Sequence, residues 1–107
     1  MKIAEDAIIP KEKLTQYLLL SRQKNDKSRF LARAGFTREN PDMLDKAIRQ
    51  LLAENEAMPD RHSEYGTFYL VEGELKGPSR TLGVVTVWLL PANTNRHRFV
   101  TLKPARE

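Results

Sequence analysis

Residues 61–90 of this 107-residue chain, RHSEYGTFYLVEGELKGPSRTLGVVTVWLL, decide its fold class. In the first half, Tyr69, Val71 and Leu75 alternate with acidic residues, which is the period-two pattern of a half-buried strand. KGPS then predicts a turn, and residues 81–90 are apolar on both parities, as in a central strand whose two faces are covered or partly covered. With a second turn in PANTN and a strand in RHRFVTL, the sequence predicts an antiparallel meander.

The residues before this meander carry helical signals. A helix is expected over about 10–20, and a second over 26–34, capped by Asp26 and ended by Gly35. The third helix, over about 40–57, begins with an Asn-Pro start signal. Its apolar residues recur at helical spacing, at Leu44, Ala47, Ile48, Leu51 and Leu52.

The expected fold class is therefore α+β, with three N-terminal helices packed on one face of a C-terminal three- to four-stranded antiparallel sheet. The length predicts a single domain over residues 1–107, with a helical half at about 10–57 and a sheet half at about 65–103. The predicted core is formed mainly by apolar residues of both halves: Leu14, Leu18, Phe30, Leu44, Ile48, Leu51, Val71, Leu75, Val85, Val87 and Phe99.

Composition excludes several classes of protein. The chain has no cysteine, which excludes disulfides, thiolate zinc sites and a cysteine nucleophile. No apolar run approaches the roughly 18 residues that span a bilayer. The N-terminal residues carry two early acids and no long apolar core, so no signal peptide is expected. We therefore expect a cytoplasmic protein without membrane contact.

Positive charge is concentrated in two segments of a chain whose net charge is +4. Residues 22–38 hold six basic residues against one acid, and residues 91–106 hold four basic residues and no acid. Such segments attract polyanions, so RNA is one expected partner. A solvated surface, or a docking face for an acidic protein such as an antitoxin, would have the same composition. A homodimer is the commonest form of self-assembly and is a further expectation.

Known sequence motifs for phosphate loops and metal sites are missing, so no metal or cofactor is predicted. Glu72 and Glu74 share a strand face, where paired carboxylates can bind a cation, but such a pair more often forms the solvent face of a hairpin. What remains is a scattered set of groups suited to metal-free RNA cleavage, which needs a base, an acid and cations.

The candidate catalytic residues are a titratable histidine and its neighbours: His62, Tyr65, Lys27, Arg98 and Thr101. The candidate nucleic-acid contacts are mainly cations: Lys24, Arg29, Arg96, His97 and Thr86. Simpler interpretations stay open, since His62 can be an exposed loop residue, Tyr65 can belong to a turn, and residues 96–98 can be a charged hairpin end. Trp88 is expected in the core rather than as a platform for base stacking.

Three motifs resemble a known family. They are DKSRFL-x3-GF at 26–36, YGTFYxVEGELxGP at 65–78 and VxTVW at 84–88, and the similarity extends from about Leu14 to Pro104. The sequence is similar to the bacterial domain-of-unknown-function family 6883. Members of that family are small stand-alone cytoplasmic proteins or C-terminal modules of larger polypeptides, a position typical of toxin domains.

The resemblance implies a role for Lys27, His62, Tyr65, Thr86 and Thr101. The order of helices and sheet also resembles the RelE, barnase and EndoU groups of RNase toxins. The glycine-rich turn GPNGR of toxin-like members is replaced by GPSRT here. The expected function is a metal-independent endoribonuclease of the small bacterial toxin type. The alternative is a non-enzymatic protein–protein interaction module with basic docking surfaces.

Overall fold

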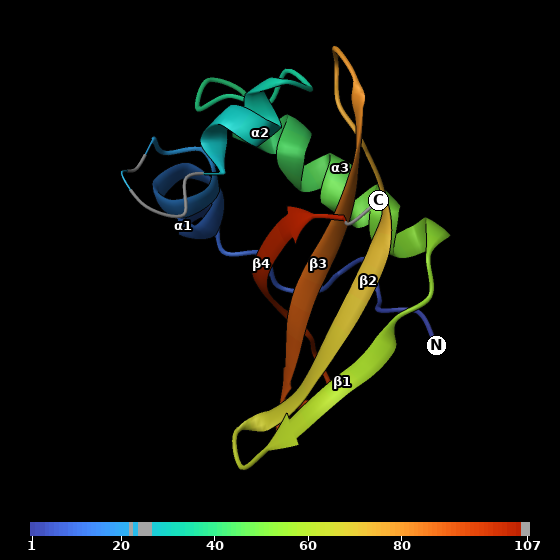
Figure 1. Ribbon diagram of the computed structural model, residues 1–107. Coiled ribbons are helices and arrows are strands. Elements are labelled where there is room, and N and C mark those ends of the chain that lie inside the picture. Colours follow the sequence, from blue (N-terminus) through green and yellow to red (C-terminus); the bar gives the residue numbers. More distant parts are fainter. Residues whose placement is uncertain (22, 24–26, 106–107) are drawn as a thin grey trace.

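A computed structural model describes residues 1–21, 23 and 27–105 of the chain (Figure 1). Its architecture is α+β, with a four-stranded antiparallel sheet that follows the helices in the chain. The helical segments are α1 (Lys11–Lys13), the π-helical turn η1 (Leu14–Leu18), α2 (Ser28–Ala32) and α3 (Pro41–Glu54). The strands are β1 (Met58–Ser63), β2 (Gly66–Lys76), β3 (Thr81–Pro91) and β4 (Arg98–Pro104), and their order in the sheet is β1-β2-β3-β4.

The three predicted helical regions contain the observed helices, which are shorter than expected. Asp26, predicted as a cap, lies outside the described residues. Asn40 precedes α3, but its side chain binds the preceding loop, accepting from the Thr37 N–H at 2.7 Å and donating to the Gly35 carbonyl at 2.9 Å. The helix ends at Glu54 rather than near residue 57, because Asn55 is already extended.

Strand β1 lies outside the range that the sequence predicts for the sheet. Its residues are almost all exposed, so the alternation that marks a half-buried strand is missing. Pro59 can occupy this strand because β1 is an edge strand, where a missing N–H need not interrupt the sheet. The pairing with β2 also contains an irregularity between Pro59 and His62. The sheet half therefore begins at Met58.

The pairing of β2 with β3 decides which side chains enter the core. Leu82, Val84 and Trp88 point toward the helices and are buried, with Trp88 in the core as predicted. Val85 and Val87 have the opposite parity, so their predicted place in the core is wrong. A strand that is apolar on both parities leaves this choice open. Phe30 is half-buried against the core, and the other predicted core residues are buried.

The N-terminal segment extends the sheet on the far side of β4. The Ile8 N–H donates to the His97 carbonyl at 2.8 Å, and the Phe99 N–H donates to the Ile8 carbonyl at 2.8 Å. Arg96 donates two hydrogen bonds to the Asp6 carbonyl, at 2.9 and 2.7 Å. This segment therefore covers the edge of β4 only near its start.

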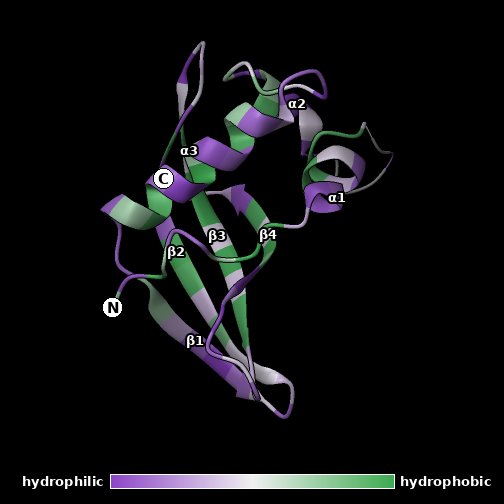
Figure 2. Ribbon diagram, turned by 180° about the vertical axis from the view of Figure 1, so that it is seen from behind, coloured by the Kyte–Doolittle hydropathy of each residue, from purple (hydrophilic) through white to green (hydrophobic). Residues whose placement is uncertain are grey.

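Among the residues that the structure describes, no helix covers one face of the sheet. Figure 1 shows α3 behind the sheet and α1 beside the edge formed by β4, and Figure 2, seen from behind, shows α3 in front of the sheet. The uncovered surface, which we call the open face, is formed by the side chains of β2, β3 and β4 that point away from the core. Its apolar members are half-buried: Phe68, Leu70, Val85, Val87 and Leu89.

The start of β2 requires a glycine. Gly66 has φ +147°, and a Cβ there would collide with the Leu90 carbonyl of β3. We expect Gly66→Ala to lower the free energy of unfolding by about 1–3 kcal/mol or more, since strain and collision act together. Gly83→Ala is the matched control on β3, because its Cβ would meet only Ala105 at an ordinary 3.6 Å. Urea unfolding measures both, and equal stability of the two variants would contradict this account.

Candidate functional site

Three polar side chains from distant parts of the chain meet beside β4. The Lys27 Nζ donates to the Thr101 Oγ1 at 2.7 Å and to the Tyr17 hydroxyl at 3.2 Å. The Tyr17 and Thr101 oxygens are themselves 3.0 Å apart. Each of the three atoms is thus within hydrogen-bond distance of the other two. We call Tyr17, Lys27 and Thr101 the edge cluster.

Local structure explains why these residues meet. Leu14 and Leu18 of η1 are buried, and Tyr17 between them is partly buried at the margin of the core. Lys27 is the residue before α2, and its carbonyl accepts from the Leu31 N–H at 3.0 Å. The backbone at both positions is therefore held by helices that are packed on the core.

A bulge in β4 aims Thr101. Phe99 pairs with Trp88 and Thr101 pairs with Val87, so Val100 is an extra residue in the strand. Without the bulge, Thr101 would share the buried face of Phe99, because residues two apart in a strand point the same way. With it, Thr101 belongs to the open face and its hydroxyl meets Tyr17 and Lys27.

The surroundings of Tyr17 lower the pKa of its phenol. The hydrogen bond with Thr101 is the main cause that lowers the pKa of Tyr17 from its ordinary value of 10.0, and the hydrogen bond and charge of Lys27 act in the same direction. Partial burial of the phenol opposes this shift. The ammonium groups of Lys13 and Lys27 each lie 5.3 Å from the centre of the Tyr17 ring.

Further cations follow the same edge. Arg98 pairs with Leu89 and Lys103 pairs with Val85, so both occupy open-face positions of β4 on either side of Thr101. Within the described residues, the ion pairs join other groups, namely the N-terminus with Glu56, Arg49 with Asp45, and Lys76 with Glu54. The edge cluster therefore lies in a positively charged part of the surface.

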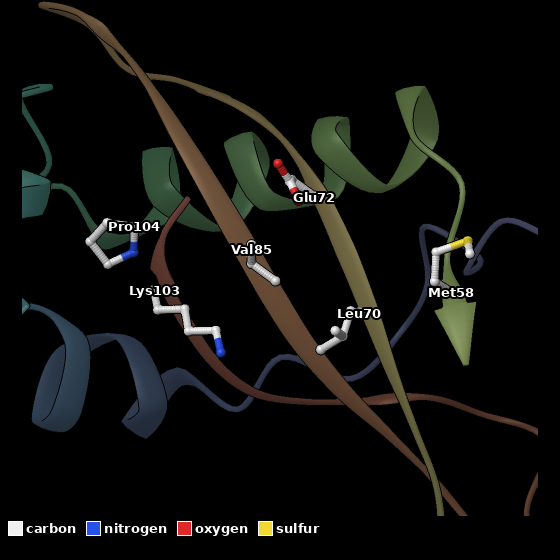
Figure 3. A pocket seen from close by; sticks show the side chains of 6 residues that line it. All are labelled: Met58, Leu70, Glu72, Val85, Lys103 and Pro104. Atoms are coloured by element: carbon white, nitrogen blue, oxygen red, sulfur yellow. The ribbon is translucent and has the colours of Figure 1, made fainter. Parts of the chain in front are cut away.

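A cavity of about 460 Å³ adjoins this edge on the open face. Figure 3 shows the side chains that line it, which come from four elements or their ends: Met58, Leu70, Glu72, Val85, Lys103 and Pro104. Its floor is apolar, and the two charged residues, Glu72 and Lys103, lie on either side of Val85.

The predicted catalytic residues fall into two groups. Lys27 and Thr101 are joined by a hydrogen bond, and Arg98 lies on the same strand as Thr101. His62 lies on β1, at the opposite edge of the sheet, where its Nδ1 is 2.8 Å from the Thr67 hydroxyl. Tyr65 is in the next turn and is 72% exposed. Three strand spacings separate β1 from β4, or roughly 14 Å, so His62 and the edge cluster cannot act on one phosphate.

The predicted nucleic-acid contacts also need correction. Thr86 is fully buried, and its hydroxyl donates to the Val71 carbonyl and accepts from the Trp88 Nε1–H. It therefore cannot donate to a phosphate. Burial lowers the pKa of His97, whose ring packs edge-on against Tyr69, so its position favours the uncharged imidazole.

The remaining cations have different positions. Arg29 is exposed on α2, and Arg96 is exposed but uses two of its N–H groups to hold Asp6. Lys24 lies outside the described residues. Sequence reasoning missed Tyr17 as a functional group, because its spacing with Leu14 and Leu18 indicates a helix face that packs on the core. It also missed Lys13 and Lys103, which no local motif distinguishes from other surface lysines.

The described residues contain no cluster of three histidines or carboxylates able to hold a metal ion. None of the helices in the described part of the chain has the length and apolar character that crossing a bilayer requires.

Fold and site together define a small basic α+β domain with an open sheet face and a polar cluster at its edge. A family model matches residues 1–106, and the chain belongs to that family, domain of unknown function DUF6883. Comparisons with curated proteins and with solved structures find no match.

The pKa of Tyr17 tests the geometry of the edge cluster. Thr101→Val removes the hydrogen bond that lowers this pKa most, and Lys27→Met removes the charge, so we expect the pKa of Tyr17 to rise in both variants. NMR titration of ¹³C-labelled tyrosines measures the shift. Thr67→Val is the matched control, since Thr67 contacts His62 at the other edge and should leave Tyr17 unchanged. An unchanged Tyr17 pKa in Thr101→Val and Lys27→Met would disprove the cluster.

Proposed function

We propose that the protein is a metal-independent endoribonuclease of the small bacterial toxin type, with the edge cluster as its reaction centre. The observation that supports this most is the contact of a lysine ammonium with a phenol of lowered pKa and a threonine hydroxyl, at 3.2 and 2.7 Å. These groups can move a proton and stabilise negative charge, which is what cleavage next to a 2′-hydroxyl requires.

The charge around the cluster favours a polyanionic substrate. Arg98 and Lys103 extend the positive surface along β4, over roughly 15 Å at the rise of an extended strand. Lys13 adds a further cation beside Tyr17. A single-stranded backbone can follow such a row, and its binding should weaken steeply with salt.

The reaction can be written with atoms balanced. Once the Tyr17 phenol has lost its proton to solvent, its oxygen accepts the proton of the 2′-hydroxyl, and the 2′-oxygen bonds to phosphorus. The bond from phosphorus to the 5′-oxygen breaks, and the leaving oxygen takes a proton from the Lys27 ammonium, while Arg98 and Thr101 stabilise the charge on the phosphate. The products are a 2′,3′-cyclic phosphate and a 5′-hydroxyl. A proton then returns from Tyr17 to Lys27 across their hydrogen bond.

In this proposal Tyr17 replaces His62 as the group that accepts the proton, because His62 lies at the far edge of the sheet. His62 and Tyr65 stay predicted contacts for RNA beyond the reaction centre. The alternative function is a protein-binding module that docks an acidic partner, an antitoxin or a second copy. The half-buried apolar residues of the open face favour it, because exposed apolar sheet surface is typical of binding sites.

RNA cleavage in EDTA by the purified protein tests the proposal. Tyr17→Phe and Lys27→Met should each slow cleavage by roughly 10²- to 10³-fold, since each removes one group that acts in the transition state. Lys46→Met, an equal loss of charge on an exposed position of α3, should retain the rate.

Urea unfolding of each variant separates loss of activity from loss of fold. If neither Tyr17→Phe nor Lys27→Met slows cleavage, the edge cluster is not the reaction centre. RNA that stays intact with the wild-type chain would contradict the nuclease and favour the protein-binding module.

A further inference from the structure

Glu72, Val85 and Lys103 form a row across the open face. Glu72 pairs with Val85 on the next strand, and Val85 pairs with Lys103 on β4. Directly paired residues have Cβ atoms about 5 Å apart, so the carboxylate and ammonium stems start roughly 10 Å apart. The ion pairs in the described part of the chain do not include Glu72 or Lys103, so neither charge neutralises the other.

The row crosses the cavity on the open face. Val85 and Leu70 supply an apolar floor, and Met58 and Pro104 close its two ends (Figure 3). The site is thus flat and apolar below, with an acceptor at one side and a donor at the other. A planar heterocycle with polar edges has the complementary shape and polarity.

We propose that this cavity binds a guanine base of single-stranded RNA. Guanine presents two adjacent donors, N1–H and the N2 amino group, and both can bind the two oxygens of the Glu72 carboxylate. Its O6 and N7 atoms are acceptors suited to the Lys103 ammonium. Adenine and cytosine present only one donor group beside a ring acceptor that would face the carboxylate, and uracil presents one N3–H donor between two carbonyl oxygens.

That the cavity and the edge cluster bind parts of one nucleotide rests on the proposed function. Lys103 and Thr101 are two residues apart on β4, and their partners Val85 and Val87 are two apart on β3. Neighbouring positions on one sheet face are separated by roughly 7 Å. A single nucleotide can bridge that separation, so the base in the cavity belongs to the nucleotide whose phosphate lies at the edge cluster.

Binding of mononucleotides tests the cavity without requiring cleavage. By calorimetric or NMR titration, 3′-GMP should bind more tightly than 3′-AMP, 3′-CMP and 3′-UMP. Glu72→Gln should weaken 3′-GMP binding roughly 10- to 100-fold, the range for loss of one bidentate base contact. Lys103→Met should also weaken it.

Glu74→Gln is the matched control for this titration. It removes the same charge two residues along the same strand face, opposite Gly83 and outside the cavity lining, and should leave binding unchanged. Equal affinity for the four mononucleotides, or 3′-GMP binding that Glu72→Gln does not weaken, would overturn the inference. An apolar peptide that binds the cavity while 3′-GMP does not would also overturn it.

Mapping of cleavage sites separates this inference from the proposed function. If both hold, the wild-type chain cuts RNA at guanines and Glu72→Gln cuts with a relaxed base preference. Cleavage without a preference for guanine would overturn the guanine site and leave the nuclease standing. Selective binding of 3′-GMP that depends on Glu72, without any cleavage, would support the base site and overturn the nuclease.

Discussion

The pairing of β2 with β3 is the constraint on which the rest of the structure depends. Both strands are 11 residues long and pair continuously from Gly66 opposite Pro91 to Lys76 opposite Thr81. A shift of one residue would exchange every inward and outward side chain. It would bring Val85 against α3 and expose Trp88, whose indole N–H is bonded to the buried Thr86 hydroxyl. The buried Thr86–Trp88 contact and the apolar core therefore specify the same register.

That register also creates the functional surface. Because Val84, Thr86 and Trp88 fill the core, Val85 and Val87 have to face the uncovered side of the sheet. Edge strand β4 then adds Lys103 beside Val85 and, after its bulge, Thr101 beside Val87. The cavity and the edge cluster are thus consecutive rows of one sheet face, which is why a proposed nuclease and a proposed base site can share one substrate.

The sequence predicts the parts of the fold that have local signals. The period of β2, the polar turns around β3 and the apolar spacing of α3 are such signals, and these elements lie close to their predicted positions. Strand β1 has none, because an exposed edge strand with a proline needs no alternation. The choice between Val84 and Val85 as core residues also has no local signal, since β3 is apolar on both parities.

The candidate site is harder to predict because its contacts are distant in sequence. Lys27 and Thr101 could be selected by chemistry and by family resemblance, but they lie 74 positions apart, and Tyr17 and Thr101 lie 84 apart. No local pattern specifies the bulge that turns Thr101 away from the core. The sequence also cannot show that Thr86 is buried, because a threonine in an apolar strand has the same sequence signature whether it faces the core or solvent.

The central claim is that RNA lies on the open face, along β4. The most direct measurement is a ¹H–¹⁵N NMR titration with a short guanine-containing oligonucleotide that lacks the 2′-hydroxyl at the cleaved position. Our account predicts that the largest amide shifts occur at Leu70, Val85, Thr101 and Lys103, and that they diminish as salt is raised. Shifts confined to α3 or to the turn near His62, or no shifts at millimolar oligonucleotide and low salt, would contradict it.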